Sequence, residues 1–181
     1  LAKINNVKVK THLATAENFQ FINNEEFDVI YIGNCLHHAD IKQTMKNVTS
    51  HLKSDGLFVS WDPIAYNPII NVYRLIASNV RTPDEHPLKI KDIKDITSCF
   101  KQSSTDYFFF FFLIVFILMI IFLRINPNKE RFFTTVVYES KKWNWLYKPL
   151  AKFDYFLLKI LPPLKLLCWN VVITGSHKKD D

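Results

Sequence analysis

The chain has 181 residues, enough for one domain with a modest core, and 49% of them are hydrophobic, which excludes a disordered protein. Its net charge of +6 comes from lysines scattered along the sequence, without a zinc-finger spacing or a basic face that carries stacking aromatics. This pattern favours a domain near an anionic membrane surface and no nucleic-acid partner, although ordinary solvated lysines give the same charge.

Two strands are predicted first along the chain. Residues 7–13, VKVKTHL, alternate between apolar and basic positions, which predicts a half-buried strand at the edge of a sheet. Residues 29–32 form a continuous apolar run, which predicts that the strand at 28–32 is covered on both faces.

A helix is predicted next, from an N-cap at Asp40 to a stop signal at Gly56. Its apolar residues recur at helical spacing, at Ile41, Met45, Val48 and Leu52. A second apolar strand follows over 57–61. Strand, helix and strand in this order predict a right-handed parallel crossover, and therefore an α/β fold.

Loops and short helices fill the next forty residues. The proline-containing loop after residue 61 leads into a predicted helix over 69–80, and a second polar loop leads into a short helix over 90–100. We expect residues 1–106 to form the C-terminal part of one domain.

The composition changes at Tyr107, where an uncharged apolar run begins. At 1.5 Å per residue, the uncharged residues 107–123 would form a helix of about 25 Å, the low end of a bilayer core, so we expect a transmembrane helix over 107–124. The alternatives are a buried strand that continues into a buried helix, and a low-complexity apolar insertion.

The last segment, residues 125–181, is apolar but interrupted by lysines and by a Pro162-Pro163 pair. With its tryptophans and tyrosines it is typical of an amphipathic, interfacial helix whose lysines reach the lipid headgroups. Residues 167–174 are expected to return to the sheet as its last strand.

His37, His38 and Asp40 follow the strand at 28–32 and raise the question of a metal site. Adjacent histidines leave the backbone in different directions, no second ligand cluster is present, and Asp40 is explained as a helix cap, so we expect no metal. The carboxyl ends of two neighbouring parallel strands instead place GNCLHH and DPIAYN at one edge, where open α/β sheets bind ligands.

These segments resemble the second half of the class I S-adenosylmethionine-dependent methyltransferase domain, of the type 11 kind. FDVI, the LHH loop and the turn LKSDG follow the family's order, with Ser54 and Asp55 as departures from LKPGG. ATAENFQF, residues 14–21, resembles the acidic segment that faces the adenine, with Thr15 where the family usually has Asp. DPIAYNP and RTPDEHPL resemble a bacterial-type subgroup.

The resemblance implies a partial Rossmann-like fold, from the third strand onward, and S-adenosyl-L-methionine as cofactor. It covers about residues 1–100, and the Gly-rich loop that holds the methionine part of the cofactor would precede Leu1, so we expect an N-terminally truncated domain. The residues implied to contact the cofactor are Ala16, Glu17, Gly33, Asn34, Leu36 and His37.

The implied catalytic residues are His38, as a base or orienting group, and Tyr66. For His38 a capping or packing role is the alternative. The implied acceptor contacts are Asp62, Asn67, Arg74 and Arg81. The alternative for the two arginines is surface ion pairing with Asp84 or Glu85.

Three functions follow as hypotheses. The first is methyl transfer to a small or lipid-like acceptor by a membrane-associated protein. The second is a non-catalytic, membrane-anchored fragment or pseudoenzyme, and the third a metal-dependent hydrolase. Cys35, Cys99 and Cys168 lie far apart, which favours a reducing compartment, so we expect the catalytic part in the cytoplasm.

Overall fold

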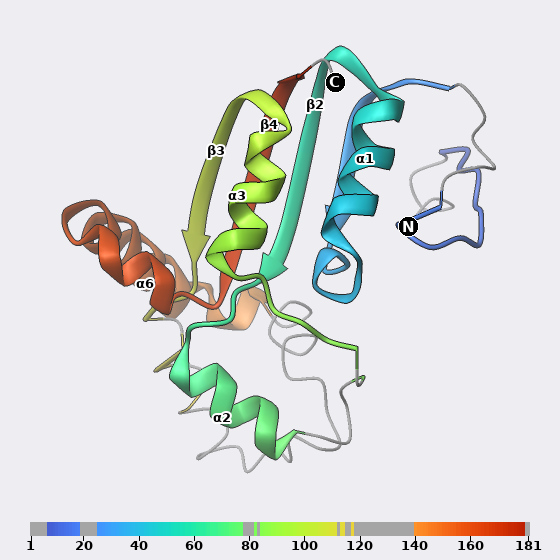
Figure 1. Ribbon diagram of the computed structural model, residues 1–181. Coiled ribbons are helices and arrows are strands. Elements are labelled where there is room, and N and C mark those ends of the chain that lie inside the picture. Colours follow the sequence, from blue (N-terminus) through green and yellow to red (C-terminus); the bar gives the residue numbers. More distant parts are fainter. Residues whose placement is uncertain are drawn as a thin grey trace.

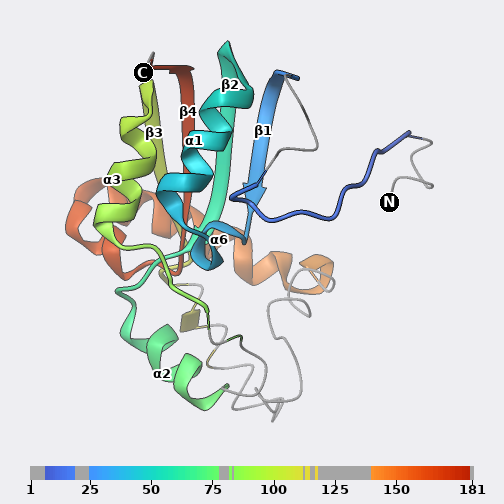
Figure 2. The same ribbon diagram turned by 45° about the vertical axis from the view of Figure 1, so that its right-hand side comes forward.

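The protein forms a four-stranded sheet with the order β1-β2-β4-β3 (Figures 1 and 2). The computed structural model describes residues 7–18, 25–77, 82, 84–111, 113–114, 117 and 140–179. The strands are β1 (Phe27–Gly33), β2 (Leu52–Pro63), β3 (Phe100–Phe108) and β4 (Asn170–Lys178). β1 and β2 are parallel, whereas β4 runs antiparallel to both β2 and β3. The predicted α/β class is confirmed.

Helices α1 (Ile41–His51) and α3 (Ile90–Ser98) lie side by side over one face of the sheet (Figure 1). Helix α2 (Pro68–Ile76) lies beyond the end of β2, and α6 (Ser140–Ile160) lies beside the end of β3. Two short 3-10 turns, η2 (Leu36–His38) and η4 (Pro162–Leu167), complete the described elements.

The predicted crossover from β1 through α1 to β2 is confirmed. Asp40 caps α1, since its Oδ1 accepts a hydrogen bond from the Gln43 N–H at 2.9 Å. Met45 and Val48 are buried in the core, as the helical spacing predicts. Gly56 is not a helix stop: α1 ends at His51, and Gly56 lies inside β2, where its position is buried.

Two predictions about strands were wrong. β1 is an edge strand in the described part of the chain, and Val29 and Tyr31 are 57% and 62% exposed, so its apolar run marks β-propensity rather than burial on both faces. Residues 7–13 are exposed and belong to no strand, and they lead away from β1 (Figure 2). The alternating pattern alone gives them no neighbouring strand to pair with.

The core lies between the sheet and its two covering helices. Phe58 of β2 and Phe100 of β3 stack with their ring centroids 5.3 Å apart, although β4 runs between their strands. Gly175 of β4 pairs with Phe58, and a Cβ at Gly175 would come within 2.3 Å of the Phe100 ring. The glycine therefore leaves the space that the Phe100 ring fills.

The other predicted elements agree with the structure within a few residues. The helix predicted over 69–80 is α2, and residues 78–80 lie outside the described residues. The helix predicted over 90–100 is α3, which ends two residues earlier. The expected last strand at 167–174 is β4, which begins at Asn170 and ends at Lys178.

The expected transmembrane segment begins inside the sheet. Tyr107 and Phe108 are the last residues of β3 and pair with β4, which agrees with the alternative in which a strand opens this segment. Residues 112, 115–116 and 118–124, together with 125–139 of the expected interfacial segment, lie outside the described residues. In the part of the chain that the structure describes, none of the helices combines the length and the hydropathy of a membrane span.

Candidate functional site

The candidate site is built at the carboxyl ends of β1 and β2, which are adjacent because the two strands are parallel. β1 ends at Gly33, and Asn34 turns the chain with a φ of 55°. Its N–H donates to the Trp61 carbonyl of β2 at 2.7 Å. Asparagine is one of the few residues that tolerate this left-handed conformation, so the turn that starts the GNCLHH loop is fixed locally.

The centre of the site is a contact between His37 and Asp62, one from each strand end. The Asp62 Oδ1 accepts hydrogen bonds from the His37 Nδ1 at 2.7 Å and from the His37 backbone N–H at 3.2 Å. His37 is 6% exposed and Asp62 is fully buried. Because an ionised carboxylate only accepts, Nδ1 of His37 carries the proton that it donates. Asp62 thus fixes both the backbone and the ring of His37.

The second carboxylate oxygen of Asp62 is buried and accepts no hydrogen bond from the described residues. A buried carboxylate oxygen without a donor is costly, and such atoms often mark a place where a ligand or water completes the contact. The orphaned oxygen lies at the edge of the sheet where ligands of open α/β folds bind.

A third segment lies across the two strand ends. The Leu88 N–H donates to the Pro63 carbonyl at 2.9 Å, and the His86 N–H donates to the His37 carbonyl at 2.6 Å. The Glu85 Oε1 comes within 4.0 Å of the His37 Nε2. Asp84 and Glu85 therefore face the two histidines, a role that the sequence analysis missed because it considered them only as ion partners of arginines.

His38 is partly exposed and is held from the same segment. Its Nδ1 lies 3.2 Å from the Asp84 Oδ2 and 3.3 Å from the Thr82 Oγ1. The hydrogen bond from the Thr82 side chain is the main cause of the lowered pKa of Asp84, and His38 contributes to it. An ionised Asp84 carboxylate accepts a hydrogen bond from the His38 Nδ1–H. In a neutral His38 ring the other nitrogen, Nε2, then has a lone pair that can accept a proton.

Ala16 and Glu17, the two residues expected at the adenine, contact α1 and its N-cap. The Glu17 Oε1 accepts a hydrogen bond from the Asp40 N–H at 3.0 Å, and this bond is the main cause of the lowered pKa of Glu17. The Ala16 carbonyl accepts from the Asn47 Nδ2 at 3.4 Å. Glu17 is thereby placed at the start of α1, and Ala16 lies beside the middle of this helix.

The remaining loop residues have packing roles. Leu36 is buried in the core, with 1% of its surface exposed. Burial raises the pKa of the Cys35 thiol, and the negative charge of Asp62 adds to the effect, so Cys35 stays protonated at neutral pH and is no nucleophile.

The residues expected to contact the acceptor differ in the contacts that the structure gives them. The Tyr66 hydroxyl accepts from the Ile90 N–H at 2.9 Å, which leaves its own proton to donate. Asn67 caps α2 by accepting from the Ile70 N–H at 3.0 Å, and its amide donates to the Leu167 carbonyl. Arg74 is buried and donates to the Asn71 side chain at 3.1 Å, so it is no surface residue. Arg81 lies outside the described residues.

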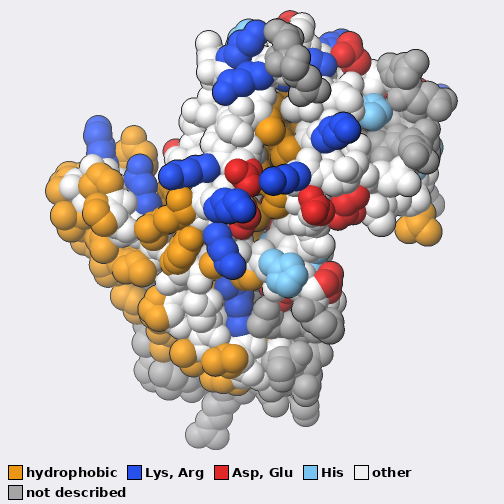
Figure 3. All heavy atoms as spheres, in the orientation of Figure 1, with side chains coloured by type: hydrophobic (Ala, Val, Ile, Leu, Met, Phe, Trp, Pro, Cys, Tyr) orange, Lys and Arg blue, Asp and Glu red, His pale blue; other side chains and the backbone are white. Residues whose placement is uncertain are grey.

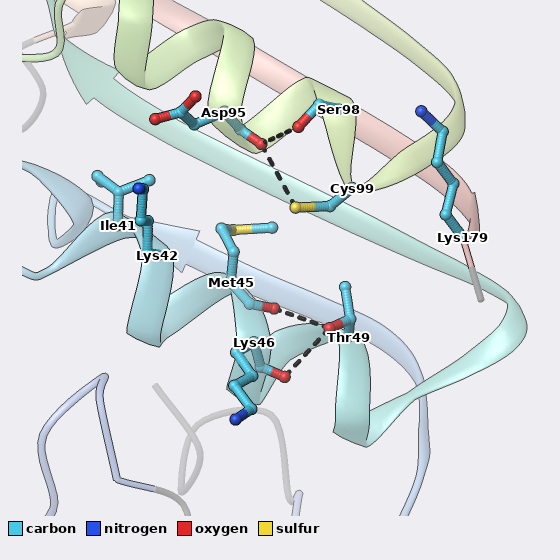
Figure 4. Close-up of a pocket in the computed structure, with 9 residues that line it drawn as sticks. All are labelled: Ile41, Lys42, Met45, Lys46, Thr49, Asp95, Ser98, Cys99 and Lys179. Carbon is cyan, nitrogen blue, oxygen red and sulfur yellow. Dashed lines mark hydrogen bonds between the residues drawn. The ribbon is translucent and has the colours of Figure 1, made fainter. Parts of the chain in front are cut away.

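Among the described residues, no three His, Cys, Asp or Glu side chains are grouped as metal ligands. A cavity of about 490 Å³ lies between α1 and α3, with Met45 and Cys99 among its lining (Figure 4). A second cavity of about 660 Å³ lies between the end of β3 and α6. The predicted site residues line neither cavity.

Comparisons with known proteins bear on this geometry. The family model described as "Methyltransferase domain" matches residues 1–60, which include β1, α1 and most of β2. Residues 1–60 are therefore similar to a methyltransferase domain. S-Adenosyl-L-methionine is therefore the expected cofactor of this methyltransferase region. None of the curated proteins compared with the chain matches it.

Two solved structures are similar to the chain. The YcgJ protein of Bacillus subtilis is 16% identical with a TM-score of 0.50, over 99% of this chain and 76% of that one. A candidate O-methyltransferase of Nostoc punctiforme is 19% identical with a TM-score of 0.36, over 47% of this chain and 28% of that one. The first likeness supports the fold alone, and the second has too low a score to add to it.

The site residues fit one end of S-adenosyl-L-methionine. The cofactor's ammonium group is a hydrogen-bond donor, and the orphaned oxygen of Asp62 is a buried acceptor at this edge of the sheet. A Cβ at Gly33 would come within 2.4 Å of the Tyr31 hydroxyl, so the Tyr31 side chain lies over this glycine. The chain has three glycines and no G-x-G motif, so the residues present match the loop side of the cofactor and not its Gly-rich side.

Proposed function

We propose that the carboxyl ends of β1 and β2 form part of the active site of an S-adenosyl-L-methionine-dependent methyltransferase. The observation that carries this proposal is the buried contact between His37, which lies inside the region that matches the methyltransferase domain, and Asp62, which follows that region and has an orphaned carboxylate oxygen. The chain spans 28% of the length of one similar solved structure and 76% of the other, so the activity of the whole protein is part of the proposal.

S-Adenosyl-L-methionine supplies an electrophilic methyl group on a sulfonium, and the protein's task is mainly to position the donor and the acceptor. Gly33, Asn34 and Leu36 border the methionine end through their backbone. His37 is a positioning residue, because its ring and its N–H are both held by Asp62. Glu17, at the start of α1, and Ala16, beside the middle of α1, border the adenine.

His38 is proposed as the group that takes a proton from the acceptor. Its Nδ1 is directed at Asp84, so the Nε2 atom is left to accept, and the ring is exposed enough to meet a second substrate. Tyr66 is proposed to donate its hydroxyl proton to the acceptor. Asn67 and Arg74 support these residues rather than contact the acceptor, because their side chains hold α2 and its neighbours.

We propose a small or lipid-like acceptor. Exposed apolar side chains surround this end of the molecule on α2, where Val72 and Leu75 are 55% and 79% exposed. An apolar acceptor would bury part of that surface when it approaches the loop that carries Tyr66.

Binding of S-adenosylhomocysteine to the full chain, measured by calorimetry, tests the cofactor part of the proposal. We expect a loss of affinity of at least tenfold in Asp62→Asn, which replaces a carboxylate oxygen by a donor, and no change in Asp55→Asn, an exposed position of the same strand. Absence of binding by the unchanged, folded chain would favour the non-catalytic alternative and refute the proposal.

Methyl transfer tests the role of His38. We expect His38→Gln to retain S-adenosylhomocysteine affinity and to lose between about 100-fold and 10,000-fold in turnover, the usual contribution of a general base. Equal turnover of His38→Gln and the unchanged chain would show that His38 is not the general base. That result would not contradict the proposed cofactor site.

A further inference from the structure

Helix α6 exposes one face that is rich in aromatic side chains. Trp145 and Tyr155 are each 73% exposed, Phe156 is 60% exposed and Ile160 is 56% exposed. The helix is amphipathic, and its buried side packs Asp154 and Leu158 inward. Large exposed apolar side chains that gather on one helix face mark a surface for a partner or a membrane.

The exposed face of α6 has two stripes. At 3.6 residues per turn, Trp145, Phe156 and Ile160 fall on one line along the helix. Beside this apolar stripe runs a stripe of exposed lysines, at Lys148, Lys152 and Lys159. Figure 3 shows hydrophobic side chains gathered over α6, with basic side chains at their border.

Among the described residues of α6 with assigned burial, none on the exposed face is acidic. Asp154 is the one acidic residue among positions 144–160. It lies on the opposite side of the helix, 6% exposed, where its carboxylate accepts from the backbone N–H groups of Phe110 at 3.0 Å and Phe111 at 2.9 Å. This contact fixes the rotation of α6 about its axis and leaves the described outer face with positive charge alone.

The lysine stripe continues beside the helix. A cavity of about 660 Å³ between α6 and β3 is lined by three lysines, two aspartates and several aromatic residues, among them Lys152, Lys159, Lys165, Asp106, Asp154, Tyr107 and Tyr155. Lys165, from η4, has its Nζ 6.0 Å from the centre of the Tyr107 ring. Lysines and aromatic rings therefore lie together along this edge of the molecule, a combination that is typical of membrane interfaces.

We propose that this face of α6 lies on an anionic phospholipid membrane. Trp145, Phe156 and Ile160 would enter the boundary between headgroups and acyl chains, and the lysines would extend to the phosphates. The charge decides the occupant: the three lysines of this face, with Lys165 beside them, outnumber the one exposed carboxylate at its edge, Asp106, so the face is complementary to an anionic lipid surface and repels a second copy of itself. This inference is independent of methyl transfer, because it uses none of the site residues.

Vesicle flotation of the full chain, without S-adenosyl-L-methionine, tests the proposal. We expect binding to vesicles of phosphatidylcholine and phosphatidylserine, weaker binding at high salt, and little binding to phosphatidylcholine alone. Trp145→Ser combined with Phe156→Ser should abolish flotation. Circular dichroism of this exposed-face variant should be unchanged.

Charge variants give the matched control. Each lysine near an anionic surface contributes about 1 kcal/mol, so replacing Lys148, Lys152 and Lys159 by Gln should weaken binding on the order of 100-fold. The same change at the exposed Lys42, Lys91 and Lys94, on α1 and α3, should leave most of the binding. Equal binding to neutral vesicles, equal loss in the two triple variants, or self-association that Trp145→Ser abolishes would each overturn the proposal.

Discussion

Removal of the Asp62 carboxylate should destabilise the whole protein, because this one group satisfies two buried donors. In Asp62→Ala the His37 ring and the His37 backbone N–H lose their acceptor, at 2.7 Å and 3.2 Å respectively. A buried donor left without a partner costs about 1–3 kcal/mol, so we expect a loss of about 3 kcal/mol in the free energy of unfolding. Asp62→Asn keeps one acceptor oxygen and should lose less.

Urea unfolding followed by fluorescence measures this loss. With a slope of about 2 kcal/mol/M, a loss of about 3 kcal/mol lowers the urea midpoint by about 1.5 M. Asp55→Ala is the control, since Asp55 is exposed on the same strand. A midpoint for Asp62→Ala within about 0.2 M of the unchanged chain, or an equal fall in Asp55→Ala, would show that the pair does not hold the two strand ends together.

Three further measurements test the packing, the capping and the titration. Gly175→Ala places a Cβ within 2.3 Å of the Phe100 ring and should lower the free energy of unfolding, measured by urea unfolding, by about 2 kcal/mol. The neighbouring Ser176→Ala should leave this free energy unchanged. Asp40→Ala should cost about 1 kcal/mol, and Asp40→Ser should restore most of it, because serine also accepts from the N–H at the start of α1. Burial raises the pKa of Cys168 to about 12 from the usual 9.0, so the unfolded chain ionises first and the stability that this thiol contributes falls between pH 9 and 12. Cys168→Ala should flatten that fall, and an identical pH profile in the two proteins would contradict it.

Local signals in the sequence predicted the central crossover well. The cap at Asp40 and the spacing of Met45 and Val48 depend on one helix and on the face that it buries, so both follow from short-range pattern. The adjacency of the loops that carry Gly33 and Asp62 follows from a rule of parallel sheets rather than from any single residue.

Other features depend on which segments meet, and the sequence pattern does not fix that. Residues 7–13 and 28–32 have the composition of strands. Whether a strand is exposed to solvent depends on the segments that pack against it, which the local sequence pattern does not predict. The contact of His37 with Asp62 joins residues 25 positions apart, and the segment with Asp84 and Glu85 crosses both strand ends by a loop path. Paired acidic residues shortly after a proline, downstream of two histidines, are the signal that would have suggested this contact.

Photo-crosslinking of the full chain with methyl-labelled S-adenosyl-L-methionine tests the central claim most directly. The account predicts label on peptides that contain Gly33 to His38 or Asp62 to Asn67, with loss of the label when S-adenosylhomocysteine competes. Label confined to other peptides, or label that the competitor leaves unchanged, would contradict a cofactor site at the carboxyl ends of β1 and β2.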